Sequence, residues 1–319
     1  MLGEGVLYEA SLAAGTHRLY LYHVNGLTEP MRFLAVASNA GDGNVRFRIQ
    51  REALEGPSAN YLAVGRAASE RFLAPPVQTL AGVFGPGDVG PLDNELLAIA
   101  AARDQLVNGI YRIETDGPMR VTVMALRQST PTFPLPMNLP PSADDGDNRE
   151  GTFAGTTRSG TYAWSTESGM ARLRIGDGGE FETDPPLSGV DEEDGAARLL
   201  RGNYGVEYAI DVDVSAPDGQ RFAVLLNPRG GNYGGAVETT FGPGPAVMQL
   251  VPEESLVVPP TTEAGVVGIY DPFTVAGDAD RLTIRLTPAG ASSLAIDLLL
   301  VPFGGPREKP LPPAGWMLY

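Results

Sequence analysis

The chain has 319 residues, of which 43% are hydrophobic, and its formal net charge of −16 comes from 39 acidic and 23 basic residues. A surface this negative argues against nucleic acids and anionic membranes as partners, because both are bound mainly through clustered lysine and arginine. The chain contains no cysteine, which excludes disulfides, thiolate nucleophiles and zinc–thiolate sites.

Glycine and proline are unusually frequent, with 40 and 28 residues respectively. Both residues interrupt long regular elements, because glycine adopts positive φ and proline lacks a backbone donor. No apolar run approaches the roughly 20 residues that cross a bilayer as a helix, so we expect no membrane span. The composition predicts an all-β fold of many short strands joined by turns.

The first part of the chain alternates between apolar and polar residues, as strands do. The expected strands lie at residues 5–12, 17–24, 31–38 and 44–51. The glycine-rich stretch at 40–44 predicts a hairpin turn between the last two of these. Residues 62–74 have the spacing of a short amphipathic helix that ends at Pro75. Asp93 is a candidate N-cap for a second, brief helix, and residues 115–118 (Thr-Asp-Gly-Pro) predict another hairpin turn.

A proline-rich and then acidic stretch at 131–150 has no periodicity and predicts a semi-rigid linker. Nine short apolar segments separated by turns follow it, a pattern that is typical of a sandwich or barrel. One of the turns, at 216–220, is predicted to close a hairpin. The sequence therefore predicts two β-sandwich-like domains, at 1–130 and 151–303. The first carries the one or two short helices, and an extended proline-rich apolar tail follows at 304–319.

The two histidines of the chain, His17 and His23, lie on one predicted strand. Residues six apart share a face of a strand, but at about 3.3 Å per residue they lie roughly 20 Å apart. A single metal ion bound at about 2.1 Å cannot join them. We therefore interpret both as ordinary strand residues and not as a site.

Calcium is the best-supported candidate cofactor, because hard cations take six to eight oxygen ligands from carboxylates and loop carbonyls. Acidic loops offer such oxygens, although none has the spacing of an EF-hand. The candidate ligands are Asp144, Asp145, Asp147 and Glu150 in one loop and Asp191 and Asp194 in another. The alternative is that both loops are solvated acidic surface without an ion.

No catalytic set emerges from the sequence. It contains no G-x-S-x-G nucleophile elbow and no P-loop. Residues 85–90 formally match G-x-G-x-x-G, but Pro86 and Pro91 favour a turn. Glycosidases need two carboxyl groups about 5–10 Å apart across a sugar cleft, and the sequence cannot choose a pair among 39 acidic residues. We therefore assign no catalytic and no cofactor-binding residue beyond the candidate calcium ligands.

Two stretches contain Gly-Asn-Tyr-Gly, at 202–205 and 231–234. Clustered glycines permit positive φ and close approach of neighbouring strands. A structural role is one interpretation, and an interface through Tyr204, Tyr233 and Arg229 is the other. A second candidate interface is the apolar end of the tail, which consists of Trp316, Met317, Leu318 and Tyr319.

Several of these stretches resemble a group of secreted or cell-surface proteins from spore-forming Gram-positive bacteria. The resemblance rests on "RLYLYHVNG", "GPSANYLAVGRAASERFL", "GIYRIETDGPMRVTVMA", "GNYGVEY" and "LNPRGGNYGGAV", and it covers nearly the whole chain. Members often accompany copper-amine-oxidase N-terminal-like or S-layer-type anchoring domains. The resemblance implies an extracellular location and no established activity. It does not imply copper, because the chain lacks those domains.

Residues 1–15 lack the basic start and apolar stretch of a signal peptide, so we expect the chain to be a mature form. We predict a non-enzymatic extracellular structural protein, a surface-layer or fibre subunit that self-associates or joins another surface protein through its tail. The alternative is a module that binds carbohydrate or a cell-wall polymer. A glycoside hydrolase-like enzyme is third.

Overall fold

The computed structural model describes residues 3–75, 80–142, 150–176, 184–217, 220–251, 267–268, 273–275 and 279–303. Of the described residues, 54% lie in strands and 9% in helices. An average globular protein has roughly 20–25% of its residues in strands. The prediction of a mainly β fold is therefore confirmed. Within the described ranges, no helix is long and apolar enough to span a membrane.

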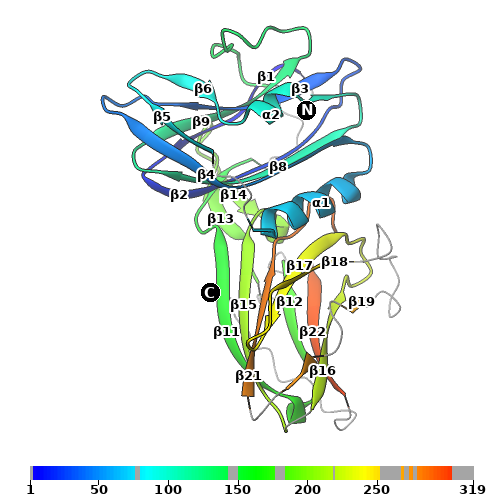
Figure 1. Ribbon diagram of the computed structural model, residues 1–319. Coiled ribbons are helices and arrows are strands. Elements are labelled where there is room, and N and C mark those ends of the chain that lie inside the picture. Colours follow the sequence, from blue (N-terminus) through cyan, green and yellow to red (C-terminus); the bar gives the residue numbers. More distant parts are fainter. Residues whose placement is uncertain are drawn as a thin grey trace. The chain divides into compact units, whose positions relative to one another are not determined.

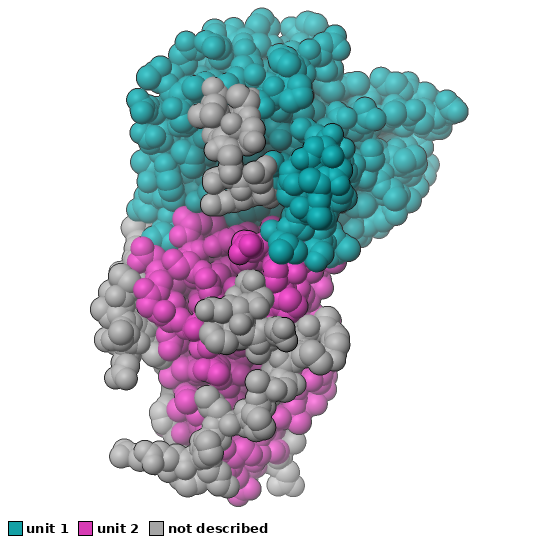
Figure 2. Space-filling model, turned by 180° about the vertical axis from the view of Figure 1, so that it is seen from behind, with its two compact units in different colours: residues 1–64, 75–154, 188–199 teal, residues 65–74, 155–187, 200–319 magenta. Residues whose placement is uncertain are grey.

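The chain divides into two compact units, coloured separately in Figure 2. Unit 1 consists of Met1–Val64, Pro75–Ala154 and Ser188–Leu199, and unit 2 consists of Gly65–Ala74, Gly155–Leu187 and Leu200–Tyr319. The expected boundaries differ from this division, because each unit takes a short segment from the other half of the chain. Such exchanges depend on pairing between distant segments, which chain order does not show.

Unit 1 contains two sheets that enclose a common apolar core. The first sheet contains β1 (Gly5–Leu12), β3 (Met31–Ser38), β6 (Val89–Pro91), β7 (Ala100–Ala101) and β9 (Met119–Arg127). The second contains β2 (Gly15–Val24), β4 (Val45–Ser58), β5 (Leu80–Phe84) and β8 (Leu106–Thr115). Their strand orders are β1-β9-β3-β6, with β7 beside β3, and β2-β8-β4-β5. Inward residues of both sheets, such as Phe33 and Phe47, form the core because side chains alternate between the faces of a strand.

Two α-helices interrupt the strands, as expected. Helix α1 (Tyr61–Leu73) ends just before Pro75. Helix α2 (Asn94–Ala98) begins at Asp93, whose side chain accepts a hydrogen bond of 2.7 Å from the Glu95 amide. This is the N-cap that the sequence predicts.

Part of the expected linker packs onto unit 1. Leu135, Met137 and Leu139 contact the second face of the first sheet, beside Leu97 of α2. The Val6 amide donates to the Pro140 carbonyl at 2.9 Å, and the Ser142 amide donates to the Val6 carbonyl at 2.7 Å. Residues 135–142 therefore pack against the first sheet and the start of β1 and do not form a free spacer.

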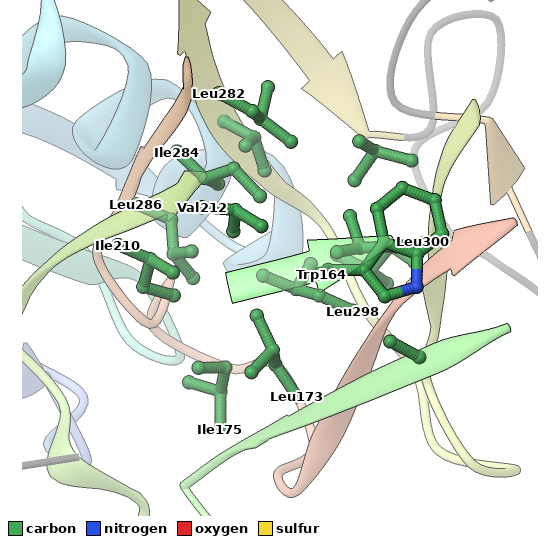
Figure 3. Close-up of a cluster of buried hydrophobic side chains, with 14 of the residues drawn as sticks. Trp164, Leu173, Ile175, Ile210, Val212, Leu282, Ile284, Leu286, Leu298 and Leu300 are labelled. Carbon is green, nitrogen blue, oxygen red and sulfur yellow. The ribbon is translucent and has the colours of Figure 1, made fainter. Parts of the chain in front are cut away.

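Unit 2 also contains two facing sheets, and Figure 3 shows the apolar side chains between them. The first sheet contains β11 (Thr157–Ser165), β15 (Glu207–Ser215), β17 (Gly235–Phe241), β18 (Val247–Val251) and β21 (Ala279–Leu286). The second contains β12 (Ala171–Ile175), β16 (Arg221–Asn227), β19 (Val267–Gly268), β20 (Phe273–Thr274) and β22 (Ile296–Phe303). Their orders are β11-β15-β21-β17-β18 and β12-β22-β16-β19, with β20 beside β16.

A small third sheet consists of β10 (Thr152–Phe153), β13 (Leu187–Val190) and β14 (Ala197–Leu200), and short 3-10 turns lie at η1 (Thr166–Ser168) and η2 (Arg201–Asn203). Side chains join this sheet to β1. The hydroxyls of Tyr8 and Thr152 lie 2.9 Å apart, and the Ser11 amide donates to Glu192 at 2.9 Å. These bonds connect residues far apart in the sequence, which explains why 188–199 belongs to unit 1.

The three turns predicted to close hairpins instead connect opposite sheets. Residues 40–44 lead from β3 to β4, 115–118 from β8 to β9, and 216–220 from β15 to β16, and in each case the two strands lie in different sheets. The prediction of paired hairpins at these turns is therefore wrong. Turn residues set where the chain reverses, whereas the packing of each strand's apolar face decides which strand it pairs with.

Candidate functional site

Strand β22 is an inner strand of the second sheet of unit 2, and the tail follows it in the sequence. It pairs antiparallel with β12 on one side, from Ala171↔Leu300 to Ile175↔Ile296, and with β16 on the other, from Arg221↔Phe303 to Asn227↔Asp297. The inward residues of β22 are fully buried; they are Ile296, Leu298 and Leu300. Residues 304–319, including the predicted interface residues Trp316, Met317, Leu318 and Tyr319, lie outside the described residues.

An ion pair strengthens the hold on β22. Asp297 is almost fully buried and accepts hydrogen bonds from Arg174 of β12 at 2.8 and 3.3 Å. Arg229 lies 3.8 Å from the same carboxylate. Arg229, a predicted interface residue, has a positive φ of 55° and a side chain that is 30% exposed. Loss of either partner would leave a buried charge without compensation, so this contact holds β12 and β22 in one register.

Strand β11 is the edge strand of the other sheet in unit 2 (Figure 1). It pairs in parallel with β15, and no other strand in the described part of the chain pairs with it. The Glu207 amide donates to the Thr156 carbonyl at 3.1 Å. Because the amides of successive strand residues point to opposite sides, even-numbered residues of β11 bond to β15. The amides and carbonyls of odd-numbered residues point to the open edge.

The side chains at the odd positions of β11 are small and mostly exposed; they are Thr157, Ser159, Thr161, Ala163 and Ser165. The even positions face the core. Trp164 packs edge-on against Phe222, with ring centroids 5.4 Å apart. Tyr162 is half-buried against the same core, and its burial, together with the negative charge of Asp184, raises its pKa to about 12.

A buried polar cluster anchors the beginning of β11. Asp184 is fully buried and accepts hydrogen bonds from Arg158, from the Gly176 amide at 2.5 Å and from the Tyr208 hydroxyl at 2.6 Å. The Asn203 amide group donates to the Tyr208 hydroxyl at 3.0 Å. Burial, and then the adjacent carboxylate, raise the pKa of Tyr208 well above its ordinary value. The hydroxyl therefore stays protonated and donates to Asp184.

The outer face of this sheet carries a ladder of ion pairs. Arg285 donates to Glu207 at 2.5 Å and to Glu238 at 2.7 Å, and so joins β15, β21 and β17. Burial alone would lower the pKa of Arg285, but the bonds and charges of these two carboxylates outweigh it and raise the pKa. Next along the face, Arg281 of β21 pairs with Asp213 of β15 at 2.8 Å. The charged residues of this face thus bind one another across neighbouring strands.

The candidate calcium ligands divide into two sets. Asp144, Asp145 and Asp147 lie outside the described residues, whereas Glu150 is described. In the second set, Arg198 binds Asp191 at 2.8 Å and Asp194 at 2.9 Å. Within the described ranges, no three acidic or histidine side chains are grouped so as to hold a metal ion. The arginine therefore occupies the carboxylates that a cation would need.

Neighbouring acids of this loop have opposite electrostatic environments. Burial, followed by the charges of Asp191, Glu150, Glu9 and Asp194, raises the pKa of Glu193. The hydrogen bond from the Ala196 amide, followed by the interaction with Arg198, lowers the pKa of Asp194. The loop therefore carries an excess of negative charge that Arg198 only partly offsets.

Both histidines lie on β2, as predicted. The His17 ring lies 2.8 Å from the Ala13 carbonyl oxygen. The His23 ring stacks on Phe33, with centroids 5.3 Å apart. Each side chain is thus engaged in local contacts of the strand and the core.

The tyrosines of the glycine-rich stretches point into unit 2. Tyr233 is fully buried, which raises the pKa of its hydroxyl above the ordinary value, and this hydroxyl has no hydrogen-bond partner within the described residues. Tyr204 is partly buried and donates to the Ser292 carbonyl at 2.5 Å. Tyr233 is therefore a core residue and not a surface contact, because its ring is covered by its own chain.

The features that sequence reasoning missed are the Arg158–Asp184 pair and the open edge of β11. A signal for the pair was present. Arg158 precedes Tyr162 and Trp164 by even numbers of residues, so the alternation places it on the face that is buried. A charge at such a position implies a buried partner. The open edge has no local signal, because it depends on which strand is left without a second neighbour.

No family model matches the chain, and no curated protein matches it. Among solved structures, it is similar to an anti-sigma factor domain-containing protein from Clostridium clariflavum, at 12% identity over 92% of this chain and 81% of that chain, with a TM-score of 0.20. It is also similar to the PBSX exported protein XepA, at 9% identity over 94% of this chain and 86% of that chain, with a TM-score of 0.20. A third similarity, at 8% identity over 93% and 88% of the two chains, is to a structure of broad bean stain virus, with a TM-score of 0.19. TM-scores this low carry no inference about this chain.

Proposed function

We propose that the chain is a non-enzymatic extracellular structural protein whose copies assemble through residues 304–319. The observation that carries the proposal is the origin of this tail in β22, a strand that is paired on both sides. The resemblance to secreted and cell-surface proteins of spore-forming Gram-positive bacteria supports the extracellular part of the proposal.

The pairing of β22 suits it to hold a connected subunit. A pull on the tail acts along β22 and loads its ladders with β12 and β16 at the same time. Each backbone hydrogen bond contributes only about 0.5–1.5 kcal/mol net, but all bonds of both ladders must slip together for the strand to leave. The Arg174–Asp297 ion pair resists the same movement.

The chemistry of the tail supplies the reason to assemble. Its last four residues, 316–319, are apolar or aromatic. Burying a tryptophan or a tyrosine removes about 150–250 Å² from water for each ring. A segment of this composition gains most when it is covered by another surface, and a second copy of the chain provides an identical surface on every subunit.

The proposal is tested by comparing the full chain with a truncated chain of residues 1–303. Light scattering on a sizing column gives the mass of each species. We expect the full chain to form species of several subunits and the truncated chain to be monomeric, with circular dichroism as the control for folding. Equal masses for the two chains would contradict the proposal.

A second variant separates apolar burial from a loss of length. Trp316→Ala combined with Leu318→Ala keeps the length of the tail and removes the two large apolar side chains that lie on one face of an extended segment. We expect this variant to assemble far less than the full chain, and Lys309→Ala in the proline-rich part to assemble normally. Pull-down on purified cell walls distinguishes the alternative, since a module that binds wall polymers would be retained with or without its tail.

A further inference from the structure

We propose that residues 314–319 of one copy add as a strand to the open edge of β11 in a second copy. This inference rests on the proposed function and names the surface that receives the tail. The added strand extends the β11-β15-β21-β17-β18 sheet of unit 2, and its amides and carbonyls pair with those of the odd-numbered residues of β11.

The tail has two chemically different parts. Prolines at 306, 310, 312 and 313 lack the amide that a strand donates, so they confine strand pairing to the six residues that follow. Proline-rich chains extend by roughly 3.1 Å per residue, so a spacer with the length of residues 304–313 can reach about 30 Å. The ladder with β12 stops at Leu300, and residues 301–303 of β22 pair with β16 alone. From there the spacer lets the last six residues reach the edge of another subunit.

The open edge of β11 suits this occupant better than the other long edges. Natural sheets protect exposed edges with charged residues, short strands or covering segments. Among the described edge strands, β1 is covered at its start by Pro140–Ser142, and β2 carries Arg18 and two histidines. The edge strands β5, β12 and β18 have five residues each, and β6 has three. β11 has nine residues, and 159–165 carry no charge.

Side-chain contacts anchor the edge strand near both of its ends. Arg158 is fixed by Asp184 at the beginning of β11, and Trp164 is fixed by Phe222 near its end. Between them, the parallel register with β15 is regular from Thr157↔Glu207 to Ser165↔Ser215. A preformed edge loses little conformational entropy when a strand is added, so most of the entropy lost on binding comes from ordering the tail.

Cysteine cross-linking tests the contact, because the natural chain has no cysteine and gives no background. One full-length variant carries Thr161→Cys on β11, and a second carries Met317→Cys or Leu318→Cys in the tail. After mixing and mild oxidation, we expect a disulfide-linked pair of the two variants on a non-reducing gel. A matched edge control replaces Thr161→Cys by Tyr20→Cys on β2 and is expected to give at least tenfold less product.

Two results would overturn the proposal. One is cross-linking that favours the Tyr20→Cys control or that is equally weak for both edges. The other is a cross-link formed within one molecule by a chain that carries both Thr161→Cys and Leu318→Cys, detected as a monomer under dilution, since the tail would then dock on its own subunit.

A proline scan of the edge tests the hydrogen bonds directly. Thr161→Pro removes an amide that points to the open edge and leaves the ladder with β15 in place. We expect it to abolish assembly, whereas Thr161→Val, which keeps the amide, assembles like the natural chain. Normal assembly by a folded Thr161→Pro variant would overturn the proposal. If this variant does not fold, the cysteine cross-linking experiment tests the proposal instead.

The two proposals fail in different ways. If truncation at 303 abolishes assembly and the Thr161 variants do not affect it, then the tail is the assembly element but β11 is not its acceptor. If neither change affects the measured mass, then the proposed function fails as well.

Discussion

Arg158 on β11 and Asp184 form a buried ion pair that ties the open edge strand of unit 2 to its interior. Asp184 is inaccessible to water, and the Arg158 side chain is 10% exposed. A buried pair is weak evidence for net stability, but the loss of one partner leaves an uncompensated charge in an apolar setting. The pair therefore makes the geometry of the edge sensitive to either residue.

Replacement of Asp184 by asparagine is expected to lower the free energy of unfolding by about 3–5 kcal/mol, because Arg158 would keep its charge without a carboxylate. Denaturant titration measures this change. The matched control is Asp213→Asn, which breaks the exposed pair with Arg281 and should cost less than about 1 kcal/mol. Equal effects of the two substitutions would show that burial of the Arg158–Asp184 pair is unimportant.

The acidic loop of unit 1 should respond to pH in opposite directions at two adjacent residues. The pKa of Glu193 is raised in the folded chain, so its charged form opposes folding, and this penalty grows as the pH rises through the shifted pKa. The pKa of Asp194 is lowered, so its charged form favours folding, and this contribution is lost as the pH falls through the folded pKa.

Glu193→Gln is therefore expected to raise the melting temperature at pH 7, and Asp194→Asn is expected to lower it. The difference for Glu193→Gln should disappear toward pH 3, where this carboxyl group is protonated in both the folded and the unfolded chain. The difference for Asp194→Asn should shrink only as the pH falls through the lowered pKa of Asp194 in the folded chain. Thermal melts at pH 3, 5 and 7 measure these effects. Shifts of the same sign for the two variants at pH 7 would contradict the described environments.

Replacing a glycine inside a helix by alanine usually stabilises the helix, but Gly65 in α1 should be an exception. A Cβ atom at this position would overlap the Gly290 carbonyl oxygen. Gly65→Ala gains about 1 kcal/mol of helix propensity, but the clash should turn this into a net loss of about 1–3 kcal/mol. Ala67→Gly is the control and should cost about 1 kcal/mol. A stabilised Gly65→Ala variant would show that the helix and the Gly290 loop lie farther apart.

Calcium stays a prediction, and the two candidate loops give different expectations. If the ion binds at the first loop, chelation lowers the melting temperature of the natural chain, and Asp144→Asn with Asp147→Asn removes that effect. Asp194→Asn should leave it unchanged, because Arg198 already binds Asp194. Identical melting curves with and without chelator would discard calcium.

Local pattern was sufficient to predict the elements. Alternation placed His17 and His23 on a strand, spacing and Pro75 placed α1, and the residue type and position of Asp93 placed the cap of α2. Each of these features depends on side chains within a few residues of one another.

The pairing between strands could not be predicted from the sequence. The turn at 40–44 reverses the chain, but Phe33 and Phe47 on either side of it face the same core from opposite sheets. A hairpin and a crossing between facing sheets have the same alternation and the same turn residues, so only the whole core distinguishes them. The contact of Tyr8 with Thr152, which draws the later segment into unit 1, depends on the same long-range packing.

Electron microscopy of the purified full chain tests the central claim most directly, because ordered assembly is visible in single images. We expect strings or sheets of regularly spaced subunits for the full chain and single particles for the chain truncated after residue 303. Single particles in both samples, at concentrations where both are folded, would contradict the account.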